Sequence, residues 1–214
     1  MDIFNDKLLI LSPHADDEIL GCGGLIAKHR KESVYIAEFT MGSLERRKEF
    51  ERFLNDFNIK NHNILYEDKY HLHLDTVPMF EIINKIDEII QKFNPEVVAI
   101  PFPSFNQDHK IVYQCSTAVL RSRRTNVRTQ PFVIIYEYPQ INWIIDDKTF
   151  MPNCYIDISS VIEEKVEMLK YFSSQINDAK YAISINGMVN TARYRGNEIS
   201  VEAAEAYMIK RLIF

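Results

Sequence analysis

The sequence predicts an α/β fold of Rossmann-like type, a three-layer sandwich in which helices cover both faces of a mainly parallel sheet. Short apolar segments alternate with longer segments whose apolar residues recur at helical intervals, and this alternation is typical of βα units. The composition of the 214 residues, 46% hydrophobic and 26% charged, is that of an ordinary globular protein with a sizeable core. No linker or repeat divides the chain, so we expect a single domain over residues 1–214.

Strands and helices are expected to alternate along the first half of the chain. Residues 7–12 are an apolar run that ends at Pro13, and residues 19–26 follow with helical spacing. The pattern repeats with a strand at 34–40 and a helix at 44–57, where Phe50, Phe53 and Leu54 share one face. The remaining elements of this half are a strand at 63–66, a helix at 79–93, a buried strand at 97–101 and a helix at about 110–121.

The second half is expected to hold strands at 132–138 and 154–158 and helices at 161–172 and 201–212. In an open parallel sheet, ligands bind in the crevice at the carboxyl ends of the strands. The residues that directly follow the strands are therefore the first candidates for a functional site.

The net charge, the first residues, the apolar runs and the cysteines argue against several classes of protein. A net charge of −5 lacks the basic excess of a nucleic-acid binder. Acidic residues come too early for a signal peptide, and no apolar run approaches the ~20 residues of a membrane span, so we expect a cytoplasmic protein. Cys22, Cys115 and Cys154 are odd in number and far apart, which indicates core thiols rather than disulfides or a thiolate zinc site.

Two polar clusters follow two of the expected strands. Residues 13–18 (PHADDE) come directly after the first strand, and residues 106–109 (NQDH) lie between the strand that ends at Pro101 and its helix. Because both clusters follow strands of one parallel sheet, we expect them to face the same crevice.

The residue types in these clusters predict a metal site. His14 and Asp17 lie three residues apart and can converge on one cation, and His109 from the other loop completes a set of three ligands. Two imidazole nitrogens and one carboxylate suit zinc and leave a position open for water. Asp16 cannot easily point the same way as Asp17, so it is the candidate general base of an amide hydrolysis. The alternative reading is an acidic helix start with a surface histidine.

Together the two clusters resemble the PIG-L/LmbE-like family of zinc-dependent de-N-acetylases. Residues 13–18 match its Pro-His-x-Asp-Asp-Glu element, and residues 106–109 match part of a His-x-Asp-His element. The resemblance implies His14, Asp17 and His109 on zinc, with Asp16 as general base. It also implies that Asp108 orients an imidazole from behind. Weaker similarity extends to Arg46, Glu49, Tyr136, Glu137, Lys165, Ser174, Gln175, Arg195, Gly196 and Glu205.

Two further positions follow from the resemblance. Arg46 resembles a substrate-contacting arginine, although a solvated helix charge paired with Glu49 explains it equally well. Asn106 stands where the family usually has histidine. Its amide can donate a hydrogen bond to an oxyanion but cannot transfer a proton, so we expect Asn106 as an electrostatic helper and Asp16 as the only proton carrier.

Other polar residues are weaker candidates. His71 and His73 lack a third partner nearby in the sequence, which makes them poor ligand candidates. The aromatic residues Tyr136, Tyr138 and Trp143 are candidates for the rim of a sugar pocket. A basic stretch could meet an anionic group but also offsets a helix dipole, which we favour; it comprises Arg121, Arg123, Arg124 and Arg128.

The resemblance implies a hydrolase that removes acetyl from an N-acetylated amino sugar, free or carried on a lipid or nucleotide. The implied cofactor is Zn²⁺, with another divalent metal such as Fe²⁺ as the alternative, and the only partner expected is the small-molecule substrate. A non-haem Fe(II) oxygenase also uses two histidines and a carboxylate, but it would leave Asp17 idle and commonly has a double-sheet β fold. A sugar-binding member of the fold with weakened catalysis is the second alternative, because of Asn106.

Overall fold

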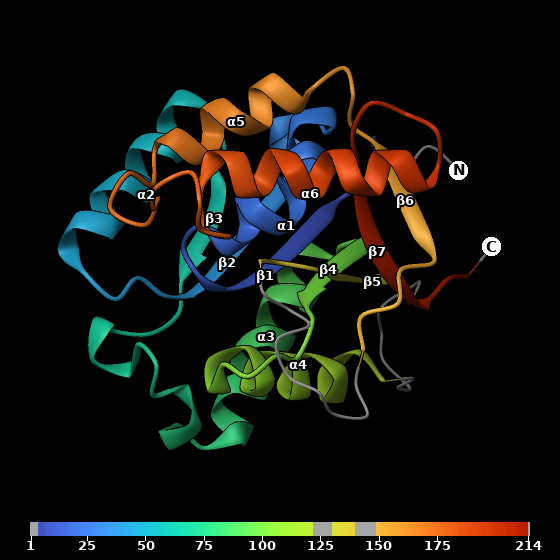
Figure 1. The fold of residues 1–214 in the computed structure, drawn as a ribbon. Helices are drawn as coiled ribbons and strands as arrows, with labels where there is room; N and C mark the ends of the chain where they lie inside the picture. The colour runs from blue at the N-terminus through green and yellow to red at the C-terminus, as the bar shows by residue number, and fades with distance from the viewer. Residues whose placement is uncertain (1–3, 122–129, 140–148, 214) are drawn as a thin grey trace.

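The computed structural model describes residues 4–121, 130–139 and 149–213. A seven-stranded sheet in the order β3-β2-β1-β4-β5-β7-β6 lies between two layers of helices (Figure 1). The strands are β1 (Leu8–His14), β2 (Val34–Thr40), β3 (Asn61–Ile64), β4 (Val97–Pro101), β5 (Phe132–Tyr136), β6 (Cys154–Asp157) and β7 (Ala204–Arg211). The helices are α1 (Asp17–Lys28), α2 (Leu44–Asp56), α3 (Met79–Phe93), α4 (Gln107–Leu120), α5 (Ile162–Lys170) and α6 (Ile185–Glu198), with short 3₁₀ turns at Lys31–Ser33, Asp68–Tyr70 and Leu74–Thr76.

The sheet is mainly parallel, as predicted. β1 pairs in parallel with both β2 and β4, and the parallel pairing extends to β3 on one side and to β5 on the other. Among the strands in the described ranges, only β7 runs against its neighbours, since it is antiparallel to both β5 and β6. β1 and β4 are therefore adjacent central strands. β2 and β3, which follow β1 in sequence, extend the sheet on one side, and the strands that follow β4 extend it on the other.

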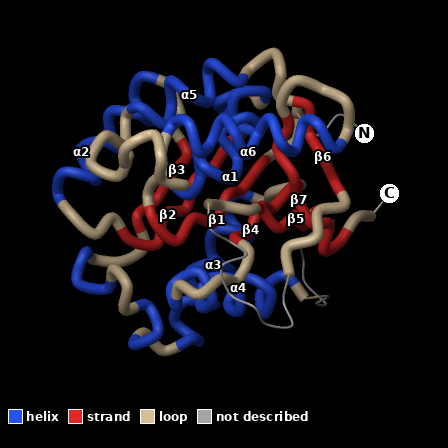
Figure 2. The backbone as a smooth tube through the Cα atoms, in the orientation of Figure 1, coloured by secondary structure: helices blue, strands red, loops and turns tan. Residues whose placement is uncertain are grey.

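Alternate residues of the central strands supply two separate cores. Leu8 and Ile10 of β1 pack with the apolar side chains of α1, α2, α5 and α6. Leu9 and Leu11 point the other way and pack with those of α3 and α4. Because both faces are covered, the central strands are apolar on both sides, which is typical of buried parallel strands. Figure 2 shows the resulting three layers, with the strands between the two groups of helices.

One predicted element has the wrong type. Residues 201–212 were expected to be a helix, but Ala204–Arg211 form β7. This strand is hydrogen-bonded on one edge to β5 and on the other to β6. Pairing on both edges outweighs the helix propensity of its alanines and Glu205.

The other differences concern a missed helix and element ends. α6 was not predicted, and it is capped by Ser184, whose hydroxyl accepts a hydrogen bond from the N–H of Gly187. The remaining predicted elements are present, with ends that differ by a few residues. Cys22 and Cys115 are buried and Cys154 is half-buried, all three as free thiols. In the described ranges no helix is long and apolar enough to span a membrane.

Candidate active site

The two polar clusters meet at the carboxyl ends of the central strands. His14 is the last residue of β1, and Asn106 to His109 follow β4 at the start of α4. β1 and β4 are hydrogen-bonded neighbours, so the loops that leave them diverge to opposite faces of the sheet and open a crevice between them. The structure therefore brings the two clusters together at one edge of the sheet.

A strained turn separates the last residue of β1 from α1. Asp16 has φ 122° and ψ −30°, a backbone conformation that non-glycine residues rarely adopt. Its carbonyl accepts hydrogen bonds from the N–H groups of Ile19 and Leu20, and its own N–H donates to Oε2 of Glu18 at 2.9 Å. These contacts hold a conformation that costs of order 1–3 kcal/mol, and they fix the direction in which the Asp16 and Asp17 side chains leave the chain.

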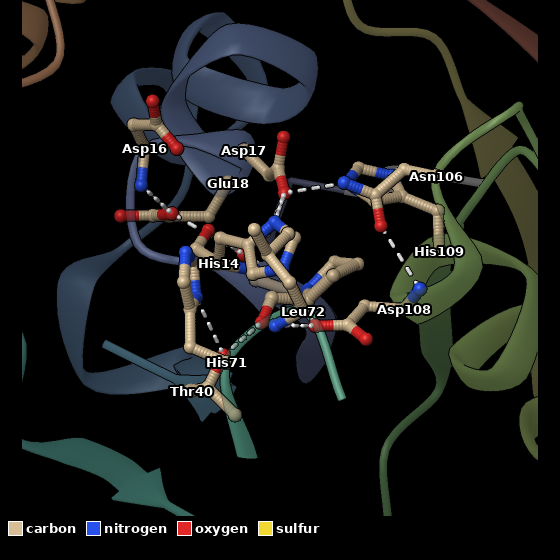
Figure 3. Close-up of polar contacts among 12 residues, drawn as sticks. His14, Asp16, Asp17, Glu18, Thr40, His71, Leu72, Asn106, Asp108 and His109 are labelled. Carbon is tan, nitrogen blue, oxygen red and sulfur yellow. Dashed lines mark hydrogen bonds and ion pairs between the residues drawn. The ribbon is translucent and has the colours of Figure 1, made fainter. Parts of the chain in front are cut away.

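Three donor atoms from β1, α1 and α4 converge next to this turn (Figure 3). Oδ2 of Asp17 lies 3.5 Å from Nδ1 of His14 and 3.1 Å from Nε2 of His109. Donors bound at ~2.0–2.1 Å in tetrahedral geometry lie about 3.3–3.4 Å from one another. The three side chains are almost fully buried, and their spacing and chemistry fit a zinc-sized cation.

The electrostatics of the three residues also fit a cation. Burial alone would lower the pKa of His14, but hydrogen bonds to Asp108 and Asp17 raise it to about 9. Burial would raise the pKa of Asp17, but His109 and His14 hold it well below its usual range. The Asp17 carboxylate thus attracts positive charge to this point, and a bound metal takes the place of protons on such ligands.

Asp108 supports His14 from behind. Its fully buried carboxylate accepts hydrogen bonds from Nε2 of His14 at 2.9 Å and from the N–H groups of Leu72 and Leu74 at 2.7 and 3.0 Å. A proton on Nε2 leaves the lone pair of Nδ1 directed toward Asp17. The contact is the one expected of a residue that orients an imidazole.

The imidazole of His109 has a different environment. Its ring packs on the ring of Tyr138, with centroids 4.2 Å apart. Within the described residues, its second nitrogen, Nδ1, is buried and has no hydrogen-bond partner. The contact of Nε2 with Asp17 and the packing on Tyr138 therefore orient this ring.

A second pair of carboxyl groups lies beneath Asp16. Glu18 accepts hydrogen bonds from the hydroxyl of Ser12 and from the N–H of Asp16, and Glu38 of β2 is fully buried beside it. Burial raises the pKa of Glu18 to about 7. Burial and the charge of Glu18 raise the pKa of Glu38 further above its usual range. The two carboxyl groups therefore hold their protons more tightly in the folded protein than in the unfolded chain.

Asp16 itself is buried, with one charged neighbour from α2. Burial and the charge of Asp17 raise the pKa of Asp16 well above its usual range, and the positive charge of Arg46 opposes them. Arg46 is half-buried. Its expected partner Glu49 instead accepts hydrogen bonds from Ser173 and Ser174, so the described structure does not contain the solvated Arg46–Glu49 pair.

Asn106 has a structural contact that the sequence analysis did not include. Its side-chain oxygen accepts a hydrogen bond from the N–H of Asp108 at 2.9 Å and so caps α4. The amide nitrogen is the atom that remains to donate to a substrate. Of the basic stretch, Arg121 follows α4 and is exposed, whereas Arg123, Arg124 and Arg128 lie outside the described residues, as does Trp143.

His71 is the residue of the site that the sequence analysis did not select. Its ring lies 4.6 Å from that of His14, edge to face, although 57 positions separate them in the chain. Burial lowers the pKa of His71 to about 4, and the charges of His14 and Arg46 act in the same direction. His71 and His73 alternate in the sequence like one face of a strand or loop, but the segment lies between two 3₁₀ turns, so the alternation does not place His71 at the site.

Comparison with known proteins yields a family and several relatives. Residues 9–120 match the family model PIG-L, described as GlcNAc-PI de-N-acetylase. The chain is 28% identical over 173 residues to the uncharacterized deacetylase YaiS of Escherichia coli (strain K12), covering 73% of this chain and 83% of that protein.

Two solved structures show how widely the fold is used. The N,N'-diacetylchitobiose deacetylase of Pyrococcus horikoshii superposes with a TM-score of 0.76 at 23% identity, over 95% of this chain and 83% of that one. GalB, the 4-carboxy-2-hydroxymuconate hydratase of Pseudomonas putida KT2440, superposes with a TM-score of 0.72 at 15% identity, over 97% and 98%. At these identities the likeness shows the fold alone, and the hydratase shows that the fold supports more than one reaction.

Proposed function

The chain belongs to the PIG-L family, whose model matches more than half of its residues, and on that premise we propose that it is a metal-dependent hydrolase that removes the acetyl group from an N-acetylated amino sugar or its conjugate. The observation that carries the proposal is the convergence of His14, Asp17 and His109 beside Asp16. The family supports a deacetylase, and the geometry of these residues is compatible with metal-assisted hydrolysis.

The three converging residues would hold the metal, and we propose zinc. A divalent cation bound there would supply Lewis acidity and lower the pKa of water. His14 presents Nδ1 because Asp108 engages its other nitrogen, and Asp17 contributes the one negative charge of the set. With three protein ligands, a position is left for a small molecule, as in catalytic rather than structural zinc sites.

Asp16 would carry the proton in both halves of the reaction. It is adjacent to a ligand, held in its direction by the strained turn, and buried from bulk water. In this role it takes a proton from the attacking water and gives it to the leaving amine. Asn106 would donate its amide N–H to the oxyanion while its oxygen caps α4.

The substrate class rests on the relatives. The family description names an N-acetylglucosaminyl lipid, and the solved archaeal relative is named for diacetylchitobiose. Both are N-acetylated amino sugars, so the shared chemistry is a sugar acetamide. The alternating βα sheet differs from the double-sheet β fold that is common among Fe(II) oxygenases, which supports the hydrolase over that alternative.

The test is acetate release by protein of defined metal content. The protein is depleted with a chelator, reloaded with one equivalent of Zn²⁺ or, without oxygen, Fe²⁺, and supplied with N-acetylglucosamine, N,N'-diacetylchitobiose and N-acetylglucosaminyl-phosphatidylinositol. We expect acetate from at least one substrate and none from depleted protein. Full metal loading without acetate from any substrate would sink the proposal in favour of a sugar-binding protein, and O₂ consumption by the Fe²⁺ form would favour the oxygenase.

A further inference from the structure

The loop that carries His71 is fastened to the candidate metal site. The carboxylate of Asp108 accepts hydrogen bonds from the N–H groups of Leu72 and Leu74, and the side chain of Gln107 donates to the carbonyl of Leu72. Leu72 has φ 60°, a left-handed conformation that leucine rarely adopts. The same carboxylate orients His14, so the position of the loop is tied to that of a candidate ligand.

The ring of His71 lies between Thr40, the last residue of β2, and Gly42, which follows this strand. The hydroxyl of Thr40 lies 3.2 Å from Nδ1 of His71. Gly42, at φ 80°, lies against the face of the ring, and a Cβ at that position would come within 2.8–2.9 Å of it. A side chain at position 42 would therefore displace the imidazole. The fastened loop, the Thr40 hydroxyl and the space left by Gly42 together hold the ring in one place.

The second nitrogen of His71 remains for another partner. A ring nitrogen of His71 lies within 4.8 Å of ligand atoms of His14 and Asp108, and the residue is half-exposed. In the described structure no hydrogen bond engages Nε2. A metal shared by His14, His71 and Asp108 is disfavoured, because the Asp108 carboxylate already accepts three N–H groups.

The chemistry of this nitrogen selects a hydroxyl group as its partner. The Thr40 hydroxyl can donate to Nδ1 of His71, or it can donate to the carbonyl of Pro13 at 3.4 Å and accept from Nδ1. The first arrangement makes Nε2 a donor and the second makes it an acceptor. A hydroxyl group both donates and accepts, so it satisfies either arrangement, whereas an anion satisfies only the first.

We propose that His71 is a substrate-contacting residue that binds a hydroxyl group of the sugar next to the acetamide held at His14, Asp17 and His109. The inference rests on the proposed function and deepens it, since it makes a hydroxylated ring part of what the site recognises. The ring of His71 lies beside that of His14 and contacts Thr40 and Gly42. Selectivity for sugars over simple N-acetyl amines thus comes from the loop rather than from the metal ligands.

The test compares two acetamides on protein that cannot turn them over. In the Asp16→Asn background, calorimetry measures the affinity for N-acetylglucosamine and for N-acetylpropylamine, which lacks hydroxyl groups. We expect His71→Ala to weaken sugar binding about 3- to 10-fold, the contribution of one neutral hydrogen bond, and to leave N-acetylpropylamine binding and metal content unchanged. Thr40→Val, which removes only the hydroxyl that orients the ring, should weaken sugar binding in the same direction.

His73→Ala is the matched control, because His73 lies in the same loop with an exposed side chain, and it should behave as the parent. Equal effects of His71→Ala on both acetamides, or none on either, would overturn the proposal. Loss of metal from His71→Ala, or two metals per chain in the parent and one in the variant, would also overturn it and assign His71 to metal binding. A parent that binds sugar through His71 but releases no acetate would refute the proposed function alone.

Discussion

Replacing Lys165 with methionine should destabilise the protein far more than replacing Lys170. Nζ of Lys165, on α5, lies 2.6 Å from Oε1 of Glu205 on β7, and both side chains are 3% exposed. Lys170 forms an ion pair of the same 2.6 Å length with Glu167, but those side chains are 51% and 58% exposed. The two pairs have the same length, but the Lys165 pair is buried and its Nζ also donates to the carbonyl of Leu20 at 2.9 Å, so the comparison reports the effect of the buried environment.

The magnitude follows from what each lysine leaves behind. Without Lys165, the Glu205 carboxylate stays buried, although it still accepts hydrogen bonds from the N–H groups of Gly24 and Leu25 and from the hydroxyl of Tyr207. Breaking a buried pair costs ~3–5 kcal/mol, and the three remaining donors place this case near about 3 kcal/mol. Methionine keeps most of the stem that packs over Gly23, so the loss reports the charge.

Thermal and urea unfolding followed by circular dichroism measures both variants. About 3 kcal/mol corresponds to a fall in Tm of about 6–12 °C for a chain of this size. Lys170→Met should change the unfolding free energy by no more than about 0.5 kcal/mol. Equal shifts for the two variants, or a loss below about 1 kcal/mol for Lys165→Met, would refute the argument that burial decides the strength of the pair.

Four further predictions concern the site. Asp16→Asn should retain the metal and lose about 10²–10⁴-fold in turnover, measured as acetate release alongside metal content; a rate within a few-fold of the parent removes Asp16 from the role of base. His109→Ala should lower the metal bound at equilibrium dialysis, and an unchanged stoichiometry means that the ligand set is wrong. Asn106→Ser should keep the cap of α4 and the stability it provides but lower turnover about 10²-fold; parental turnover would leave Asn106 as a cap only. Glu38→Gln should flatten the pH dependence of stability. Burial and the charge of Glu18 raise the pKa of Glu38 in the folded protein, so the folded state binds the proton more tightly and the parent loses stability as the pH rises above about 4.3. An unfolding free energy of the variant that falls with pH as steeply as the parent's would contradict this.

The fold was predictable wherever local pattern and tertiary environment agree. The helix at Met79–Phe93 buries Ile82, Ile86 and Ile90 on one face, and the spacing is visible in the sequence. The prediction of a helix for residues 201–212 was wrong because pairing with the neighbouring strands β5 and β6, which lie far away in the chain, decides between helix and strand here. α6 was missed because its asparagines and two glycines lower its helix propensity.

The candidate site divides in the same way. The proximity of His14, Asp17 and His109 was predictable because they lie at the end of a strand or in the first turn of a helix that follows one, and strand ends of a parallel sheet meet. The position of His71 was not predictable, because it depends on hydrogen bonds that the backbone N–H groups of an irregular loop donate to the Asp108 carboxylate. The cap formed by Asn106 was not predicted, because Asn106 was compared only with the family's histidine as a group that contacts substrate.

The strained turn at Asp16 has a consequence for how this protein can be improved. Its φ of 122° suits glycine better than any other residue, so a screen for heat resistance alone would favour Asp16→Gly and discard the proposed base. On the proposed role of Asp16 as general base, the residue that strains the backbone is kept at this position because turnover requires its carboxylate. Libraries directed at this protein therefore require a selection for activity in every round, since the substitution that relieves the strain at this turn also removes the carboxylate proposed as the base.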